Sequence, residues 1–302
     1  MSMFIKILFF LKKLNFLNYL ERILLNQGKI LSNFNRDKKF DKLSDYEFKI
    51  FSQWGEDGII DFLVKEIPIK NKTFIEFGVE DFSESNCRFL LMNSDWSGFV
   101  IDESKINIQK LKCSNYFWKY NLEVLCAFID KENINELLKK SNFDSDLGIL
   151  SIDIDGNDYH VLKNINYFKP RIIICEFNPI FGTDKKITIP YDPKFYRTKK
   201  HYSNLYWGAS INAFIFLLNK LEYTLIGTGM LGSNAYFVKN SLLTDHLRTM
   251  AKKPFNFNFN FRESRDQNGN LNFLTKEKRM KEIESTEVLN VETNLIEKVS
   301  KN

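Results

Sequence analysis

The chain has 302 residues, of which 44% are hydrophobic and 27% are charged. This is the composition of an ordinary globular protein, and it excludes a disordered, collagen-like or disulfide-scaffold chain. The formal net charge is +5, a value that by itself suggests a nucleic-acid or membrane partner. Residues 1–42 carry nine basic and three acidic groups, so the remainder of the chain is close to neutral. Because the chain after residue 42 has almost no net charge, a general nucleic-acid binder is disfavoured.

The first predicted element is a helix over residues 3–26, in which apolar residues recur at three- and four-residue spacing and lysines accompany them. A basic amphipathic helix of this kind can lie on an anionic membrane. It can equally pack on its own domain or on a second copy in a homo-oligomer. Its longest uncharged apolar run, Ile7–Leu11, is far shorter than the ~20 residues of a membrane span. We therefore expect a cytoplasmic protein, held at the inner membrane face if the helix binds there.

Residues 27–45 are polar and predict a linker, after which short apolar runs alternate with helical patterns. The predicted strands cover residues 73–77, 98–101, 124–129, 147–154, 171–177, 223–227 and 235–239. The predicted helices cover residues 58–66, 131–138, 159–165 and 212–221, with another that starts near Ser85 and has Ser83 as its N-cap. This alternation predicts an α/β fold whose parallel sheet is covered on both faces.

The pattern divides the chain into three parts. Residues 1–45 form the basic helix and linker, residues 46–245 the α/β domain, and residues 246–302 a C-terminal extension with a partly polar tail. We expect the tail after Thr275 to contribute little to the core. Phenylalanine and asparagine alternate over residues 255–261, which predicts an edge strand or a surface for a partner.

Acidic residues gather where the predicted strands end. They are Glu76, Asp102, Asp130, Asp153, Asp155, Asp158 and Glu176. Because the carboxyl ends of parallel strands share one edge of a sheet, we expect these side chains near one ligand. Neighbouring carboxylates resist ionising together. A metal cation, a cationic ligand, or hydroxyl and amide donors must therefore offset them.

The turn after the first strand selects among these ligands. Gly78 there and Asp102 after the second strand fit a ribose diol, since a carboxylate accepts two hydroxyl hydrogen bonds. The turn lacks the further glycines of a pyrophosphate-binding loop, and Glu80 and Phe82 stand in their places. Because Glu80 would repel a pyrophosphate, the sequence predicts a cationic nucleoside without phosphates, and S-adenosyl-L-methionine meets that description.

Two roles are open for the residues after the fourth strand. Asp153, Asp155 or Asp158 could be the general base that takes a proton from an acceptor hydroxyl. Alternatively, Asp153 and Asp155 could bind a divalent cation together with Glu176, and oxygen ligands favour Mg²⁺, Ca²⁺ or Mn²⁺. The competing interpretation is that no metal binds and Asp153 orients the cofactor or the backbone.

Several segments together resemble the FkbM-like class I methyltransferases, and within them the branch found in bacterial surface-polysaccharide (capsule) loci. They are FSQWGEDGII (51–60), FIEFGVEDFSESNCRFLL (74–91), WSGFVID (96–102), LSIDIDGNDYHVL (150–162) and IICEFNPIFG (173–182). The resemblance implies a Rossmann-like seven-stranded sheet and methyl transfer from S-adenosyl-L-methionine, usually to oxygen. On the matching positions, the resemblance implies that the cofactor binds near Glu76, Gly78, Asp102 and Asp153. From their places beside the strand ends, we predict that Gln53, Glu84, Ser85, Asn86 and Asp130 also bind it.

The function expected from these observations is O-methylation of a sugar, or of a sugar substituent such as phosphoramidate, in a bacterial surface polysaccharide. The loop after the fifth strand, with Tyr191, Arg197 and His201, is long and aromatic, as suits a lid over a polar acceptor. One alternative is a non-catalytic member of the fold that binds a partner. Another is a metal-dependent nucleotide-sugar transferase, whose diphosphate Glu80 and Asp81 disfavour.

Overall fold

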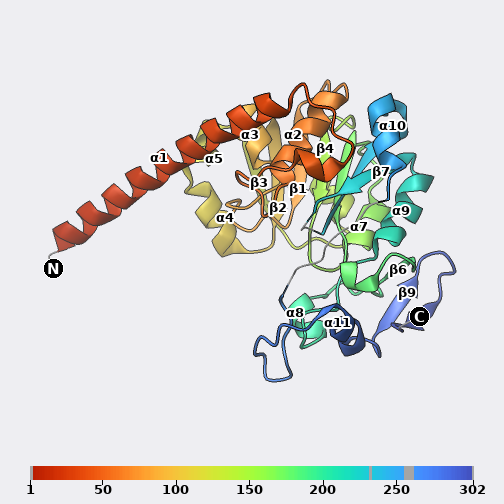
Figure 1. Cartoon of the computed structure of the whole chain (residues 1–302). Coiled ribbons are helices and arrows are strands. Elements are labelled where there is room, and N and C mark those ends of the chain that lie inside the picture. The colour runs from red at the N-terminus through yellow and green to blue at the C-terminus, as the bar shows by residue number, and fades with distance from the viewer. Residues whose placement is uncertain (1–2, 231–232, 255–261, 301–302) are drawn as a thin grey trace.

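The computed structural model describes residues 3–230, 233–254 and 262–300, with side chains from Asn18 onward. Figure 1 shows a sheet between helices, a long N-terminal helix that extends away from it, and a smaller lobe beside it that carries the C-terminus. The edge strand predicted over residues 255–261 lies outside the described residues.

A seven-stranded sheet forms the centre of the molecule. Its strands are β1 Thr73–Phe77, β2 Ser97–Asp102, β3 Leu122–Cys126, β4 Ile149–Ile152, β5 Ile172–Glu176, β7 Tyr223–Thr228 and β8 Asn234–Lys239. Their order is β3-β2-β1-β4-β5-β8-β7. The first five strands run parallel, and β8 is antiparallel to both of its neighbours. This arrangement confirms the predicted Rossmann-like sheet of the class I methyltransferase fold.

Helices cover both faces of this sheet. They are α2 Glu56–Glu66, α3 Arg88–Asn93, α4 Lys105–Lys112, α5 Asn115–Lys119, α6 Ile134–Lys139, α7 Asp158–Asn164, α9 Ile211–Lys220 and α10 Asp245–Ala251. Helix α1 Met3–Asn35 packs on α2 and α3, and α8 Arg197–Lys200 and α11 Lys276–Glu282 lie in the smaller lobe (Figure 1). Apolar side chains of α6, α7 and α9 pack in one core, and those of α2, α3, α4 and α10 pack in the other. Because side chains alternate along a strand, Ile75 and Phe77 of β1 enter the first core and Phe74 enters the second.

A second, three-stranded sheet forms the smaller lobe. Its strands are β6 Ile187–Thr188, β9 Glu287–Asn290 and β10 Ile296–Lys298. Ile283, Val288 and Val299 of the tail are buried there in one cluster with Trp207. The expectation that the tail contributes little to the core is wrong, because these apolar residues pack against the long connection after β5. The remaining elements are short 3₁₀ helices at Leu43–Tyr46, Pro179–Phe181 and Asn240–Leu242.

The predicted N-terminal helix is present and is longer than expected. It continues to Asn35, through part of the segment predicted as a linker. Gly28 lets it approach α3, since a Cβ there would stand 2.4 Å from a ring carbon of Phe89. The first part of α1 projects beyond the domain (Figure 1). Within the described residues, no helix has the length and apolar character needed to cross a membrane.

Several predicted boundaries need correction. The fourth strand covers residues 149–152 rather than 147–154, and the helix predicted over residues 131–138 begins at Ile134. The helix expected near Ser85 begins at Arg88, with Cys87 rather than Ser83 at its N-cap. The cause is the buried Glu76, whose carboxylate accepts hydrogen bonds from the Ser85 hydroxyl and from the amides of Asn86 and Cys87 at 2.8–3.1 Å. Those groups are thereby held in a turn instead of a helix. The third strand covers residues 122–126 rather than 124–129, because residues 122–126 pair with β2.

Candidate functional site

The reversal in strand order lies between β1 and β4, since β2 and β3 follow β1 on one side and β4 lies on the other. Ligands of such sheets bind in the crevice at the carboxyl ends of the strands at this point. A cavity of about 580 Å³ opens there. Its acidic lining residues are Glu80, Glu84, Asp102, Glu103, Asp153, Asp155, Glu176 and Glu263. Among the described lining residues, Arg197 is the basic one.

Gly78 brings the ends of β1 and β4 together. Its φ of +69° is a left-handed conformation, and a Cβ at this position would stand 1.6 Å from the carbonyl oxygen of Asp153. Its amide donates to the carbonyl of Ile101 at 3.0 Å, which ties the turn to β2 as well. Glycine is therefore required here both for its backbone angle and for the close approach of the two strand ends.

Asp102, the last residue of β2, is fixed at the same edge. One carboxylate oxygen accepts the amide of Glu80 at 2.8 Å, and the other accepts the amide of Ser104 at 2.8 Å. Burial raises the pKa of Asp102. Both oxygens are thus positioned in the cavity wall, and the neighbouring residues 127–129 (Ala-Phe-Ile) add an apolar surface to that wall. A diol beside a flat apolar ring system matches this combination.

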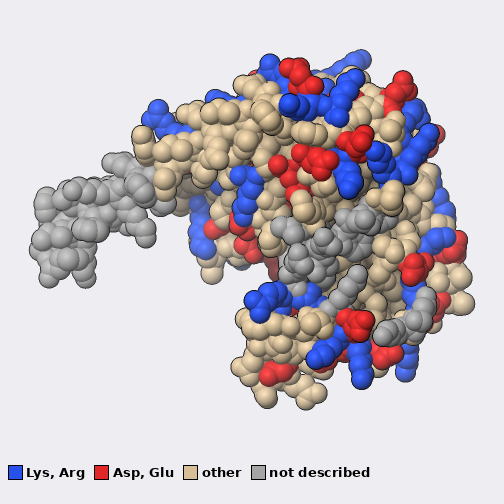
Figure 2. All heavy atoms as spheres, in the orientation of Figure 1, with Lys and Arg blue, Asp and Glu red and all other residues tan. Residues whose placement is uncertain are grey.

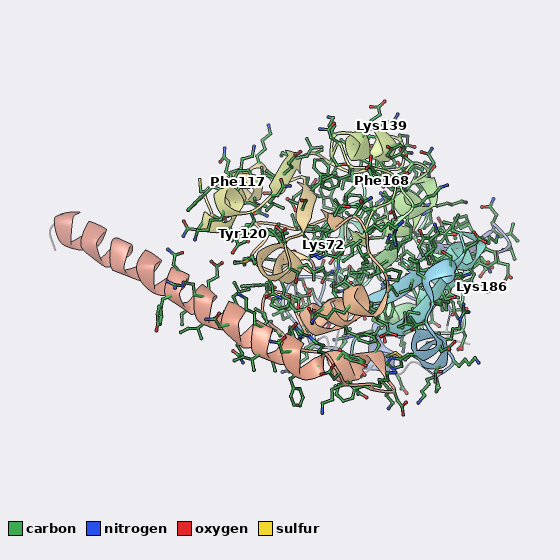
Figure 3. The ribbon with its side chains drawn as sticks, turned by 90° about the horizontal axis from the view of Figure 1, so that it is seen from above. Lys72, Phe117, Tyr120, Lys139, Phe168 and Lys186 are labelled. Carbon is green, nitrogen blue, oxygen red and sulfur yellow. The ribbon has the colours of Figure 1, made fainter. Side chains whose placement is uncertain are left out.

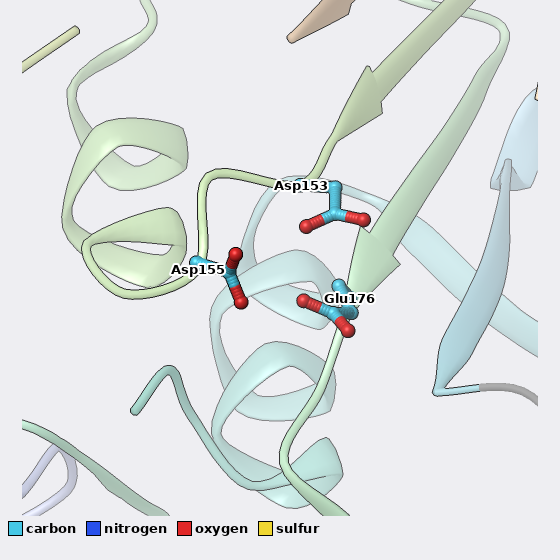
Figure 4. Close-up of side chains that lie close together, drawn as sticks. All are labelled: Asp153, Asp155 and Glu176. Atoms are coloured by element: carbon cyan, nitrogen blue, oxygen red, sulfur yellow. The ribbon is translucent and has the colours of Figure 1, made fainter. Parts of the chain in front are cut away.

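Three carboxylates converge after β4 and β5 (Figure 4). Oxygens of Asp153, Asp155 and Glu176 lie within 4.8 Å of one another. Burial and the nearby Glu176 carboxylate raise the pKa of Asp153 well above its ordinary value. Burial, followed by the charge of Asp155, raises the pKa of Glu176 to about 8. Asp153 and Glu176 therefore resist ionising together, as expected for buried neighbours.

Arg197 partly offsets this charge from the opposite wall. Its Nη1 donates to Asp155 at 2.7 Å, and its Nε donates to the carbonyl of Asn204 at 2.8 Å. The guanidinium carbon lies 4.7 Å from the centre of a Trp207 ring, and Nη2 lies 3.9 Å from Glu263. This wall of carboxylate, guanidinium, amide and aromatic groups faces the strand ends across the cavity. It belongs to the long connection predicted as a lid, although Tyr191 and His201 of that connection do not line the cavity.

Seven of the predicted site residues lie together in the lining of the cavity. These are Gln53, Gly78, Glu84, Asp102, Asp153, Asp155 and Glu176. The others, Glu76, Ser85, Asn86, Asp130 and Asp158, are not among its lining residues.

Each of the residues outside the lining has a place in the surrounding loops. Glu76 holds Ser85 and Asn86 in the turn before α3. Asp130 accepts the backbone amides of residues 132 and 133 ahead of α6. Asp158, at the start of α7, accepts the amides of residues 154 and 156 at 2.8 Å, and burial raises its pKa to about 6. These contacts shape the turns that carry the cavity residues.

Sequence reasoning missed several residues of the opposite wall. Asn157 and Asn204 are polar residues in loops, and Trp207 is expected to be a packing residue on composition alone. Glu263 comes from the segment before α11, and no local pattern marks it as part of the site. Only the folding of the C-terminal residues against the connection after β5 brings it to the cavity.

Neither a family model nor a curated protein matches the sequence. Some solved structures show a weak similarity to the chain. TrmK of M. capricolum with S-adenosyl-homocysteine is 10% identical, with a TM-score of 0.38 over 62% of this chain and 71% of that one. The N-terminal domain of EvdMO1 with S-adenosyl-homocysteine bound is 10% identical, with a TM-score of 0.37 over 72% of this chain and 94% of that one.

An O-methyltransferase family protein from Burkholderia thailandensis is 11% identical, with a TM-score of 0.36 over 61% of this chain and 57% of that one. At these identities and TM-scores the likeness concerns the fold alone. The function proposed below therefore rests on the residues of the cavity.

Proposed function

We propose that this protein is an S-adenosyl-L-methionine-dependent methyltransferase. The observation that carries the proposal is the acidic cavity at the β1–β4 switch point, with Gly78 and Asp102 at one end. A pyrophosphate would be repelled by Glu80, Glu84 and Glu103, all of which line that end. A nucleoside with a sulfonium and an ammonium group complements the same charges.

The residues present fit this cofactor part by part. Asp102 is placed to accept the ribose hydroxyls, and residues 127–129 offer an apolar surface to the adenine. Glu80 and Glu84 suit the ammonium group of the methionine moiety, with Gln53 beside them in the wall. The bound cofactor supplies a methyl group activated by its sulfonium charge. The protein's own task is to align an acceptor oxygen with that methyl group and to remove its proton.

We propose a sugar hydroxyl, or a sugar substituent such as phosphoramidate, in a bacterial surface polysaccharide as the acceptor. The wall formed by Asn157, Arg197, Asn204, Trp207 and Glu263 supports this, because it combines hydrogen-bond donors and acceptors with aromatic surface. Such a wall can hold a ring of hydroxyl groups in a fixed orientation. The resemblance to methyltransferases of polysaccharide loci supports the same substrate class.

Cofactor binding gives the direct test. In titration calorimetry, S-adenosyl-homocysteine is expected to bind, and a UDP-sugar and NAD are not. Asp102→Ala is expected to weaken that binding by about 10–100-fold, because it removes two hydrogen bonds to a charged group. Asp144→Ala is the matched control, since Asp144 is exposed and lies outside the cavity lining, and its affinity should equal that of the wild type.

The alternatives give different results in the same experiment. Preferential binding of the UDP-sugar would replace the proposal with a nucleotide-sugar transferase. A folded protein that binds none of the three ligands would indicate a non-catalytic partner-binding module. Unchanged affinity in Asp102→Ala would reject the ribose role of Asp102.

A divalent cation is a second proposal for Asp153, Asp155 and Glu176. Their spacing within 4.8 Å supports it, and such an ion would acidify an acceptor hydroxyl. Arg197 already pairs with Asp155, so an ion would compete with that guanidinium. If the ion is required, EDTA should lower the methylation rate at least about tenfold, and Mg²⁺ or Mn²⁺ should restore it. A rate that EDTA leaves unchanged contradicts the cation.

A further inference from the structure

The face of α1 that packs on the domain is mostly polar or small. Its residues, at alternating three- and four-residue spacing, are Asn18, Glu21, Leu25, Gly28, Ser32 and Asn35. Glu21 pairs with Arg88 of α3, and Ser32 accepts a hydrogen bond from Lys65 of α2 at 2.5 Å. Asn35 donates to the carbonyl of Tyr46 at 3.1 Å. This face is attached to the domain through these polar contacts and through Leu25, which together with Leu31 packs on the buried cluster of Phe48, Ile50, Phe51 and Phe89.

The outward side of α1 carries a row of large apolar residues that are exposed. They are Tyr19, Leu20, Ile23, Leu24, Ile30 and Phe34, which are 38–68% exposed, with the exposed Asn26, Gln27 and Asn33 between them. Figure 2 shows the described part of this helix as a largely tan ridge beside the domain. Surface helices normally turn the apolar stripe inward and the polar face to water. Here the order is reversed, and exposed apolar rows of this kind mark a contact with something else.

The positive charge of the first half of α1 favours an anionic partner. Among residues 3–17, the polar ones are Lys6, Lys12, Lys13 and Asn15. The acidic residue of the helix, Glu21, is already paired with Arg88. A second copy of α1 would bring like charges together, whereas anionic lipid head groups would neutralise them.

We propose that α1 is a peripheral membrane anchor that lies in the plane of an anionic lipid surface. Its exposed apolar side chains enter the boundary between head groups and acyl chains, and the positive charge of its first half attracts the helix to the anionic surface. The projection of α1 from the domain, seen in Figures 1 and 3, leaves the helix accessible to such a surface. This inference is independent of the proposed methyl transfer, and its test requires no substrate.

The test is sedimentation of the full-length protein with lipid vesicles. We expect binding to vesicles of phosphatidylcholine mixed with phosphatidylglycerol, weaker binding at high salt, and little binding to phosphatidylcholine alone. Ile23→Glu should lower the partition coefficient at least about tenfold, because it removes one large apolar side chain from the inserted face. Lys12→Ala and Lys13→Ala should each lower it about fivefold.

Matched controls separate the anchor from general effects of charge and hydrophobicity. Ile106→Glu changes an isoleucine of α4 that is 67% exposed, and Lys139→Ala with Lys140→Ala changes two exposed lysines at the end of α6. Figure 3 shows Lys139 on a part of the domain away from α1. Both controls should bind vesicles like the wild type.

Three results would overturn the proposal. One is a wild-type protein that does not sediment with the anionic vesicles. Another is an Ile23→Glu variant that binds them as well as the wild type while its circular dichroism is unchanged. The third is a stable dimer in sedimentation velocity that Ile23→Glu dissociates, because the apolar face of α1 would then belong to a second copy.

Discussion

Gly78→Ala is expected to destabilise the protein by about 2–5 kcal/mol and to abolish cofactor binding. A left-handed backbone angle costs a residue with a side chain about 1–2 kcal/mol. The new Cβ would also stand 1.6 Å from the carbonyl oxygen of Asp153, which is backbone and cannot rotate away. The ends of β1 and β4 must therefore separate, at a cost typical of overpacking, about 1–3 kcal/mol. The measurement is denaturant unfolding together with calorimetry of S-adenosyl-homocysteine.

Gly269→Ala provides a matched control for this prediction. Gly269 has a φ of +83°, positive like the +69° of Gly78, yet nothing lies within 4 Å of the position that its Cβ would occupy. The control therefore carries the cost of the backbone angle without the collision, and it should lose about 1–2 kcal/mol. Equal losses in the two variants would show that the contact with Asp153 is not what requires glycine at position 78.

Much of the fold could be predicted because the strands are short apolar runs that end at polar turns. The TFIEF run predicted β1 to the residue, and the pattern of alternation predicted the parallel sheet. Helix starts were harder to place, since the turn before α3 depends on Glu76, a carboxylate from another element. The small sheet of β6, β9 and β10 joins segments about one hundred residues apart, and no local pattern contains that pairing.

In the candidate site too, local sequence predicted some residues, and tertiary contacts determined the others. Asp102 and Asp153 follow buried strands, and the rule for parallel sheets placed them at one edge. That rule says which end of a strand a residue occupies, but not whether its side chain has a nearer partner. Asp158 illustrates the difference, because both of its oxygens accept amides of its own turn. Glu263 shows the converse, since only tertiary packing brings it to the cavity.

Asp153→Asn is expected to lower kcat for methyl transfer by about 10²–10⁴-fold while S-adenosyl-homocysteine still binds. This prediction assigns Asp153 the role of general base, whose loss typically has an effect of that size. Asp155 is held by Arg197, and Asp158 is engaged by two backbone amides. Asp153 lines the cavity and shares a hydrogen bond with the Glu176 carboxyl group, and no salt bridge of the described residues gives it a basic partner. Burial and the neighbouring carboxylates raise the pKa of Asp153, which makes its ionised form a stronger base.

Comparing Asp153→Asn with Asp155→Asn shows whether a loss of activity reflects a missing base, a missing cation ligand or weaker cofactor binding. Asp153→Asn removes one of several crowded buried charges, so its melting temperature should not fall below that of the wild type. Asp155→Asn should retain most of kcat if Asp153 acts as a base, because Asp155 serves chiefly to hold Arg197. If the two variants lose activity equally and EDTA also lowers the wild-type rate, the carboxylates act as ligands of a cation. If Asp153→Asn instead weakens S-adenosyl-homocysteine binding as much as it lowers kcat/KM, Asp153 holds the cofactor and another group removes the proton.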